Sequence, residues 1–210
     1  MILRITQLIN KILDILNIHP DTNQKYILSS LFLSGLLGTY ASPAITKAII
    51  TDLPAEWIAF SALFGSVSGL LIGVIWKGKT REFATKFFMW LAITESVLSF
   101  ALAMFLCFVY YNVWVFAIAS LLYSSFISIF VGKCIMAFKA SLWNDKEREV
   151  YDNNLSIVYG IVAVLGFSIA LLAMPSLKVA LFLWGVGCIV DDFGWVFVYY
   201  KNRDKLGALR

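Results

Sequence analysis

The sequence predicts an all-α integral membrane protein built as a bundle of six transmembrane helices. Its 210 residues are 60% hydrophobic and only 14% charged, and their mean hydropathy is +0.83. A water-soluble domain cannot carry this composition without exposing large apolar patches, so lipid is the expected solvent for most of the surface. Six apolar runs are also long enough to cross a hydrocarbon core of about 30 Å at about 1.5 Å per residue.

The first element, residues 1–22, is predicted to be an amphipathic helix on the membrane surface. Ile5, Leu8 and Ile9 begin an apolar series at helical spacing, and polar residues fill the positions between. A polar stretch from His19 to Asn23 ends the pattern. No cleavable signal sequence is expected, because the apolar residues here are not continuous.

Residues 23–200 form the predicted bundle, and residues 201–210 form a basic tail. Aromatic side chains mark several ends of the apolar runs, as is typical of membrane interfaces. The six predicted spans lie near 26–50, 57–76, 84–108, 113–138, 155–174 and 179–200.

The basic residues predict the orientation. Of the 17 Lys and Arg residues, all but Lys47 and Lys178 fall in the two terminal segments and in the regions after the second and fourth spans. By the positive-inside rule, that side is cytoplasmic and both termini are inside. We expect a multi-pass protein of a bacterial inner (cytoplasmic) membrane, surrounded by lipid. The positive net charge is explained by topology, so no nucleic-acid partner is expected.

Four ionisable residues lie deep enough in the predicted spans to need an explanation, namely Glu95, Lys133, Asp191 and Asp192. Each costs at least about 2.5 kcal/mol to place in a bilayer core, so each needs an explanation. Glu95 falls near the midplane of the third span, where a carboxyl group can bind and release a proton as a coupling site does. The alternative is a structural glutamate that is hydrogen-bonded between helices.

Asp191 and Asp192 lie in the inner half of the sixth span. Adjacent residues on a helix point about 100° apart, so at most one of the two is expected to face a central cavity squarely. Lys133 lies near the cytoplasmic end of the fourth span, and we expect its ammonium group to reach the interface. A buried ion pair with one of the aspartates is the alternative.

Two rows of small residues lie on the second and fourth spans. Gly65, Gly69 and Gly73 form a small-xxx-small row, which lets another helix approach closely. Packing within the chain is the simpler interpretation, and a dimer interface is the alternative. The serines of the fourth span either line a polar path or bond to the preceding helical turn; they are Ser120, Ser124, Ser125 and Ser128.

No catalytic residue, metal site or cofactor is expected. Cys107, Cys134 and Cys188 lack the close Cys or His neighbours that a zinc or disulfide site needs, and we interpret them as small buried hydrophobic residues. The sequence also lacks the common enzyme motifs, such as HExxH, GxSxG and a phosphate-binding glycine loop. We therefore do not expect an enzyme.

From about residue 26 to 205 the chain resembles the amino-terminal half of a major facilitator superfamily transporter. Its most specific part is the loop after the second span, where Gly73 and Arg81 fall on positions that match the family's signature. Lys77 replaces the usual acidic residue there, and Lys79 lies in the same loop. The segment Lys146–Ser156 is similar to the family's link between the fourth and fifth spans. The fourth span lacks the usual basic residue and polar motif, and the fifth lacks the antiporter signature.

The resemblance implies a half-size secondary transporter, proton-coupled, for a small or amphipathic solute. One bundle lacks the opposite wall that such carriers use, and a homodimer restores it. The alternative is a non-transporting membrane protein that binds a small-molecule or peptide ligand, such as an immunity protein against a bacteriocin-like agent. A half-carrier that pairs with a different half is a third possibility.

Overall fold

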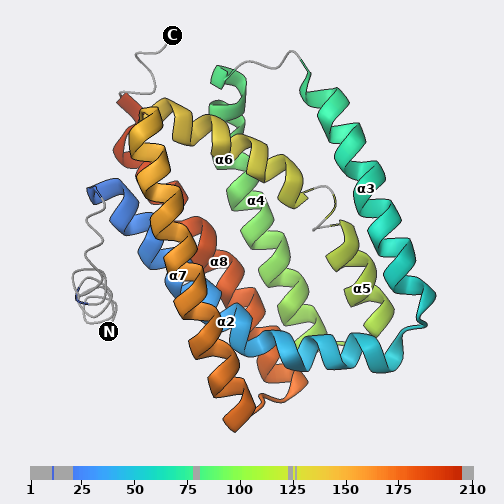
Figure 1. Cartoon of the computed structure of the whole chain (residues 1–210). Coiled ribbons are helices and arrows are strands. Elements are labelled where there is room, and N and C mark those ends of the chain that lie inside the picture. The colour runs from blue at the N-terminus through green and yellow to red at the C-terminus, as the bar shows by residue number, and fades with distance from the viewer. Residues whose placement is uncertain (1–10, 12–20, 78–80, 123–124, 126, 205–210) are drawn as a thin grey trace.

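The computed structural model describes Lys11 and residues 21–77, 81–122, 125 and 127–204 (Figure 1). Within these ranges the chain forms seven α-helices and no strand, so the all-α prediction is confirmed. The helices are α2 (Thr22–Asp52), α3 (Glu56–Trp76), α4 (Arg81–Phe108), α5 (Val113–Leu122), α6 (Ser128–Leu142), α7 (Asp145–Leu172) and α8 (Leu177–Lys201).

Five of the described helices are long and apolar enough to cross a membrane, as in a multi-pass membrane protein. They are α2, α3, α4, α7 and α8, and they correspond to the first, second, third, fifth and sixth predicted spans.

The described residues of the fourth predicted span, 113–138, include two α-helices. The 10-residue helix α5 ends at Leu122 and the 15-residue helix α6 begins at Ser128, and Figure 1 shows them as separate helices. Ser125 and Ile127 between them have π-helical backbone.

Helices α2, α4, α7 and α8 form the tightly packed part of the bundle. Near the starts of α2 and α7, Gln24 donates to the Glu147 carbonyl oxygen at 3.1 Å. Further along both helices, Thr39 donates to the Val162 carbonyl oxygen at 3.2 Å, so α2 and α7 run in the same direction. Helix α8 returns between them and α4 in the opposite direction (Figure 1).

Glycines permit the close approach of these helices. A Cβ atom at Gly194 of α8 would lie 3.0 Å from the Ile27 Cα atom of α2. One at Gly185 of α8 would lie 2.5 Å from the Ala103 Cβ atom of α4. A separation of 2.5 Å essentially never occurs between real atoms and one of 3.0 Å is unusually tight, so the packing at both positions favours glycine.

Helix α2 contains Pro43 and bends, and its last part runs toward α3 (Figure 1). Proline lacks the amide donor and its ring clashes with the preceding turn, which explains the bend. The last part of α2 places Ile45 and Ile49 against the buried side chains of Phe116 and Leu181.

Helix α3 lies at the edge of the bundle, and among its described side chains only Ser68 and Ile72 are buried. A Cβ atom at Gly65 would lie 3.6 Å from the Ser125 hydroxyl oxygen, and one at Gly69 would lie 3.9 Å from the Ile129 side chain. These two glycines therefore face the chain's own α5–α6 region, which favours packing within the chain over a dimer interface. Gly73 meets no described atom within 4 Å.

The helix ends that carry most basic residues lie at one end of the bundle, called the basic end below. It contains the starts of α2, α4 and α7 and the end of α8, and Lys178 lies at the opposite end. Apart from Lys11, Asp21 and Thr22, the predicted surface helix 1–22 lies outside the described residues. The structure describes only residues 201–204 of the predicted basic tail.

Candidate functional site: a buried carboxyl cluster

Two of the predicted carboxyl side chains are buried between α4 and α8. Glu95 of α4 is 7% exposed and Asp192 of α8 is 6% exposed. The Ser96 hydroxyl donates to Asp192 Oδ2 at 2.5 Å. Glu95 directly precedes Ser96 in α4, so its buried side chain lies at the same level of the bundle. Residues from two facing helices thus form one polar cluster in an apolar interior.

Asp191 joins the cluster from the side of α2. The Ser34 hydroxyl of α2 lies 2.9 Å from Asp191 Oδ1, to which it donates, and Asp191 directly precedes Asp192 in α8. The two aspartates are therefore attached to different helices, in agreement with the predicted angle of about 100° between them. We call Glu95, Asp191 and Asp192 the carboxyl cluster.

The carboxyl cluster lies deep in the bundle. Asp191 is ten residues from the end of α8 at Lys201, or about 15 Å along the helix. Glu95 is eight residues from Phe87, where the apolar part of α4 begins, or about 12 Å. Both positions are near the middle of a hydrocarbon core about 30 Å thick, where a carboxyl group is most costly.

Neither aspartate of the cluster is ion-paired with a lysine or arginine among the described residues. Lys133 is exposed on α6, and within the described ranges no ion pair joins it to Asp191 or Asp192. The expected position of Lys133 at the interface is compatible with this placement, and the alternative buried pair is not formed. Hydrogen bonds from Ser34 and Ser96 bind the two carboxyl groups instead; such a bond contributes about 0.5–1.5 kcal/mol.

Three buried polar atoms lie between the basic end and Asp191. They are Gln24 Oε1, the Tyr151 hydroxyl and Asn154 Nδ2, and none has a hydrogen-bond partner among the described residues. Tyr151 and Asn154 share one face of α7, and the Tyr151 ring lies 6.0 Å from that of Trp195, one turn along α8 from Asp191. Buried polar groups of this kind are usually satisfied by water.

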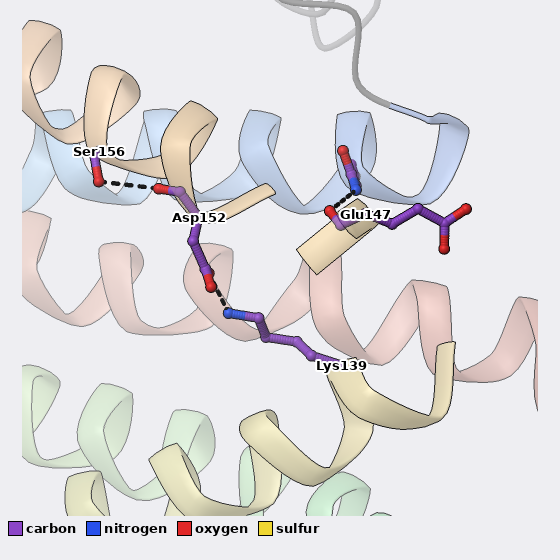
Figure 2. Close-up of polar contacts among 5 residues, drawn as sticks. Lys139, Glu147, Asp152 and Ser156 are labelled. Atoms are coloured by element: carbon purple, nitrogen blue, oxygen red, sulfur yellow. Dashed lines mark hydrogen bonds and ion pairs between the residues drawn. The ribbon is translucent and has the colours of Figure 1, made fainter. Parts of the chain in front are cut away.

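The connection between α6 and α7, called the α6–α7 corner, lies at the basic end next to the row of Gln24, Tyr151 and Asn154. Figure 2 shows Lys139 of α6 reaching Asp152 of α7, with 2.5 Å between Nζ and Oδ1. The Lys139 ammonium also lies 4.6 Å from the centre of the Tyr151 ring. The Trp143 indole stacks on the same ring and donates to Asp21 Oδ2 at 2.8 Å. The corner is thereby fixed to the start of α2.

The residues of the proposed signature loop lie away from the carboxyl cluster. Lys77 is exposed at the end of α3, and Lys79 lies outside the described residues. Arg81 begins α4, 14 residues or about 21 Å along the helix from Glu95. The loop and the cluster are therefore separate features.

The described residues contain no group of three or more His, Cys, Asp or Glu side chains that could hold a metal ion. No family model, no curated protein and no solved structure matches this chain. The resemblance to the major facilitator superfamily therefore stays a prediction, and the cluster must be interpreted from its own geometry.

Sequence reasoning identified the three acids but missed their partners. Ser34 and Ser96 bind the aspartates, and Tyr151 and Asn154 extend the polar row. Ser96 directly follows Glu95, and Ser30 and Ser34 share one face of α2, so a search for polar faces opposite the acids could have found them.

Proposed function

We propose that this chain is a half-size secondary carrier, coupled to protons, for a small or amphipathic solute. The observation that carries the proposal is the carboxyl cluster, in which Asp191 and Asp192 of α8 accept hydrogen bonds from serines of α2 and α4 deep in the bundle, with buried Glu95 next to Ser96 on α4. Acids retained at such cost in a membrane interior are a common feature of proton relays.

The hydrogen bonds of the cluster suggest how a proton could be coupled to helix packing. An ionised aspartate only accepts hydrogen bonds, whereas a protonated one also donates. Adding or removing a proton at Asp191 changes its bond to Ser34 of α2, and the same change at Asp192 alters its bond to Ser96 of α4. Protonation would thus change how α8 is attached to its two neighbours.

The row of Gln24, Tyr151 and Asn154 supports a route for the proton from the basic end. Their unpartnered atoms can bind water and lead along α7 toward Asp191. By the positive-inside rule this end is cytoplasmic, so the route would connect the cytoplasm with the carboxyl cluster.

The proposal is tested first by proton binding. Infrared titration of the purified protein should show the C=O band of a buried protonated carboxyl group, which should be lost or shifted in Glu95→Gln and Asp192→Asn. Glu149→Gln makes the same chemical change at an exposed position of α7 and should leave that band unchanged.

The second test is transport by proteoliposomes that contain a pH-sensitive dye. A panel of uncharged aromatic solutes is added outside, and at least one should produce a pH change inside that requires Glu95. An equal change with Glu95→Gln would remove this residue from the mechanism. No solute-dependent change with the wild-type protein would instead favour the non-transporting alternative.

A second copy of the chain is proposed to supply the second half of the carrier. Since Gly65 and Gly69 face α5 and α6, the face of α3 left for a partner carries exposed Leu63, Ser66 and Leu70. A cysteine introduced at Ser66 should form a disulfide-linked dimer in native membranes, above the background of the three native cysteines. Failure at several positions along this face would count against the homodimer.

A further inference from the structure

A cavity of about 540 Å³ lies in the half of the bundle away from the basic end, between α2, α3, α5 and α8. This volume is in the range of sites for small organic molecules. Its lining begins at Gly38 of α2, one turn from Ser34, which holds Asp191. The cavity and the carboxyl cluster are therefore neighbours along α2.

The lining combines aromatic rings with hydroxyl groups. Trp57, Phe116 and Trp184 come from α3, α5 and α8, and the rings of Phe116 and Trp184 meet edge-on with 5.8 Å between their centres. Ser42, Ser61 and Ser120 come from α2, α3 and α5. Ring edges and faces favour another aromatic group, and a serine hydroxyl can accept as well as donate a hydrogen bond.

The lining contains no Asp, Glu, Lys or Arg. A charged ligand would lose its hydration on entering and find no opposite charge, which is costly in an apolar site. An acyl chain would fill the space but would form no hydrogen bond with the hydroxyls of Ser42 and Ser120. These observations favour an uncharged aromatic molecule with at least one hydrogen-bonding atom.

We propose that this cavity binds uncharged aromatic solutes that carry a hydrogen-bond acceptor. The inference deepens the proposed carrier function, since it names the class of solute for a site beside the carboxyl cluster. It rests on that function only for the fate of the ligand, because binding itself needs neither a pH gradient nor Glu95.

Benzophenone is a suitable probe, because it is uncharged, has two rings and one carbonyl acceptor, and attaches covalently to nearby C–H groups under ultraviolet light. The full-length protein in lipid nanodiscs is irradiated with benzophenone, and the labelled peptides are identified by mass spectrometry. Labelling at residues 38–49, 57–61 and 116–121 should saturate with concentration and fall when a non-photoreactive diaryl alcohol competes.

Gly38→Leu and Gly160→Leu provide a matched pair of variants. Neither glycine has a described atom within 4 Å of an added Cβ, so both substitutions are accommodated at that atom, but only Gly38 lines the cavity. Gly38→Leu should lower the saturable labelling by at least about tenfold, equivalent to about 1.4 kcal/mol of binding free energy. Gly160→Leu should leave it unchanged.

Two results would overturn the proposal, and a third would reject only the carrier function. Unsaturable labelling spread over lipid-facing side chains, in equal amounts in both variants, would show that benzophenone is only dissolved in the bilayer. A phospholipid that stays bound in native mass spectra, and whose removal is needed before labelling, would assign the cavity to lipid. Saturable binding with no solute-dependent proton movement would keep the binding site and reject the carrier.

Discussion

Replacing Gly166 by alanine should force α2 and α7 apart. An added Cβ atom would lie 2.7 Å from the Thr39 Cβ atom and 3.1 Å from the Tyr40 backbone nitrogen. The Thr39 side chain could rotate away only by giving up its 3.2 Å hydrogen bond to the Val162 carbonyl oxygen. The Tyr40 backbone has no such freedom, so the helices themselves must shift.

The cost can be worked from these contacts with Gly160 of the same helix as control. Overpacking of this kind destabilises by about 1–3 kcal/mol, whereas Gly→Ala within a helix gains up to about 1 kcal/mol. Gly160 is exposed and an added Cβ meets no described atom within 4 Å, so Gly160→Ala carries only the gain. Gly166→Ala should therefore be less stable than Gly160→Ala by about 1–3 kcal/mol.

The assay is reversible unfolding in mixed micelles of increasing SDS content, followed by circular dichroism and tryptophan fluorescence. Both variants make the same chemical change in α7, so the difference between them isolates the contact with α2. Equal unfolding free energies, within about 0.5 kcal/mol, would refute the packing of α7 on α2 through Gly166.

Three further predictions concern the basic end and the orientation. Trp143→Phe removes the indole donor to Asp21 and should lower the free energy of unfolding by about 1 kcal/mol in the same assay. Lys139→Gln removes an ion pair with Asp152, whose carboxylate is 56% exposed. The loss of unfolding free energy should therefore be under about 1 kcal/mol and should shrink in high salt. A larger loss that does not depend on salt would contradict this. A cysteine at Lys178 should react with a membrane-impermeant maleimide on intact cells, whereas one at Lys139 should react only after permeabilisation; the opposite pattern would overturn the orientation.

The fourth predicted span shows a limit of predicting helices from the local sequence pattern. Its apolar content indicated a helix from Val113 to Phe138, and both α5 and α6 are indeed helical. Hydropathy does not distinguish α-helical from π-helical backbone, so it could not place the π-helical Ser125 and Ile127. Where α5 ends and α6 begins depends on tertiary packing, which a one-dimensional pattern does not contain.

The glycine row on α3 shows the same limit for predicting which helix packs against it. Spacing alone predicted that Gly65 and Gly69 lie beneath another helix, and it left open whether that helix belongs to the same chain. The distances of 3.6 Å to Ser125 and 3.9 Å to Ile129 from added Cβ atoms favour packing within the chain, because the path of the chain in space brings this region to the face with Gly65 and Gly69.

By itself the sequence determined the all-helical class, the approximate bounds of five long apolar helices and the acids that lie within them, because hydropathy and helical period depend only on residues near one another in the chain. The tertiary structure decided which acids meet and what binds them. Ser34 and Asp191 are 157 residues apart, and Ser96 and Asp192 are 96 apart. Such pairs are set by how helices pack, through glycines that allow close approach and a proline that turns α2, and packing is a property of the whole bundle rather than of any one segment.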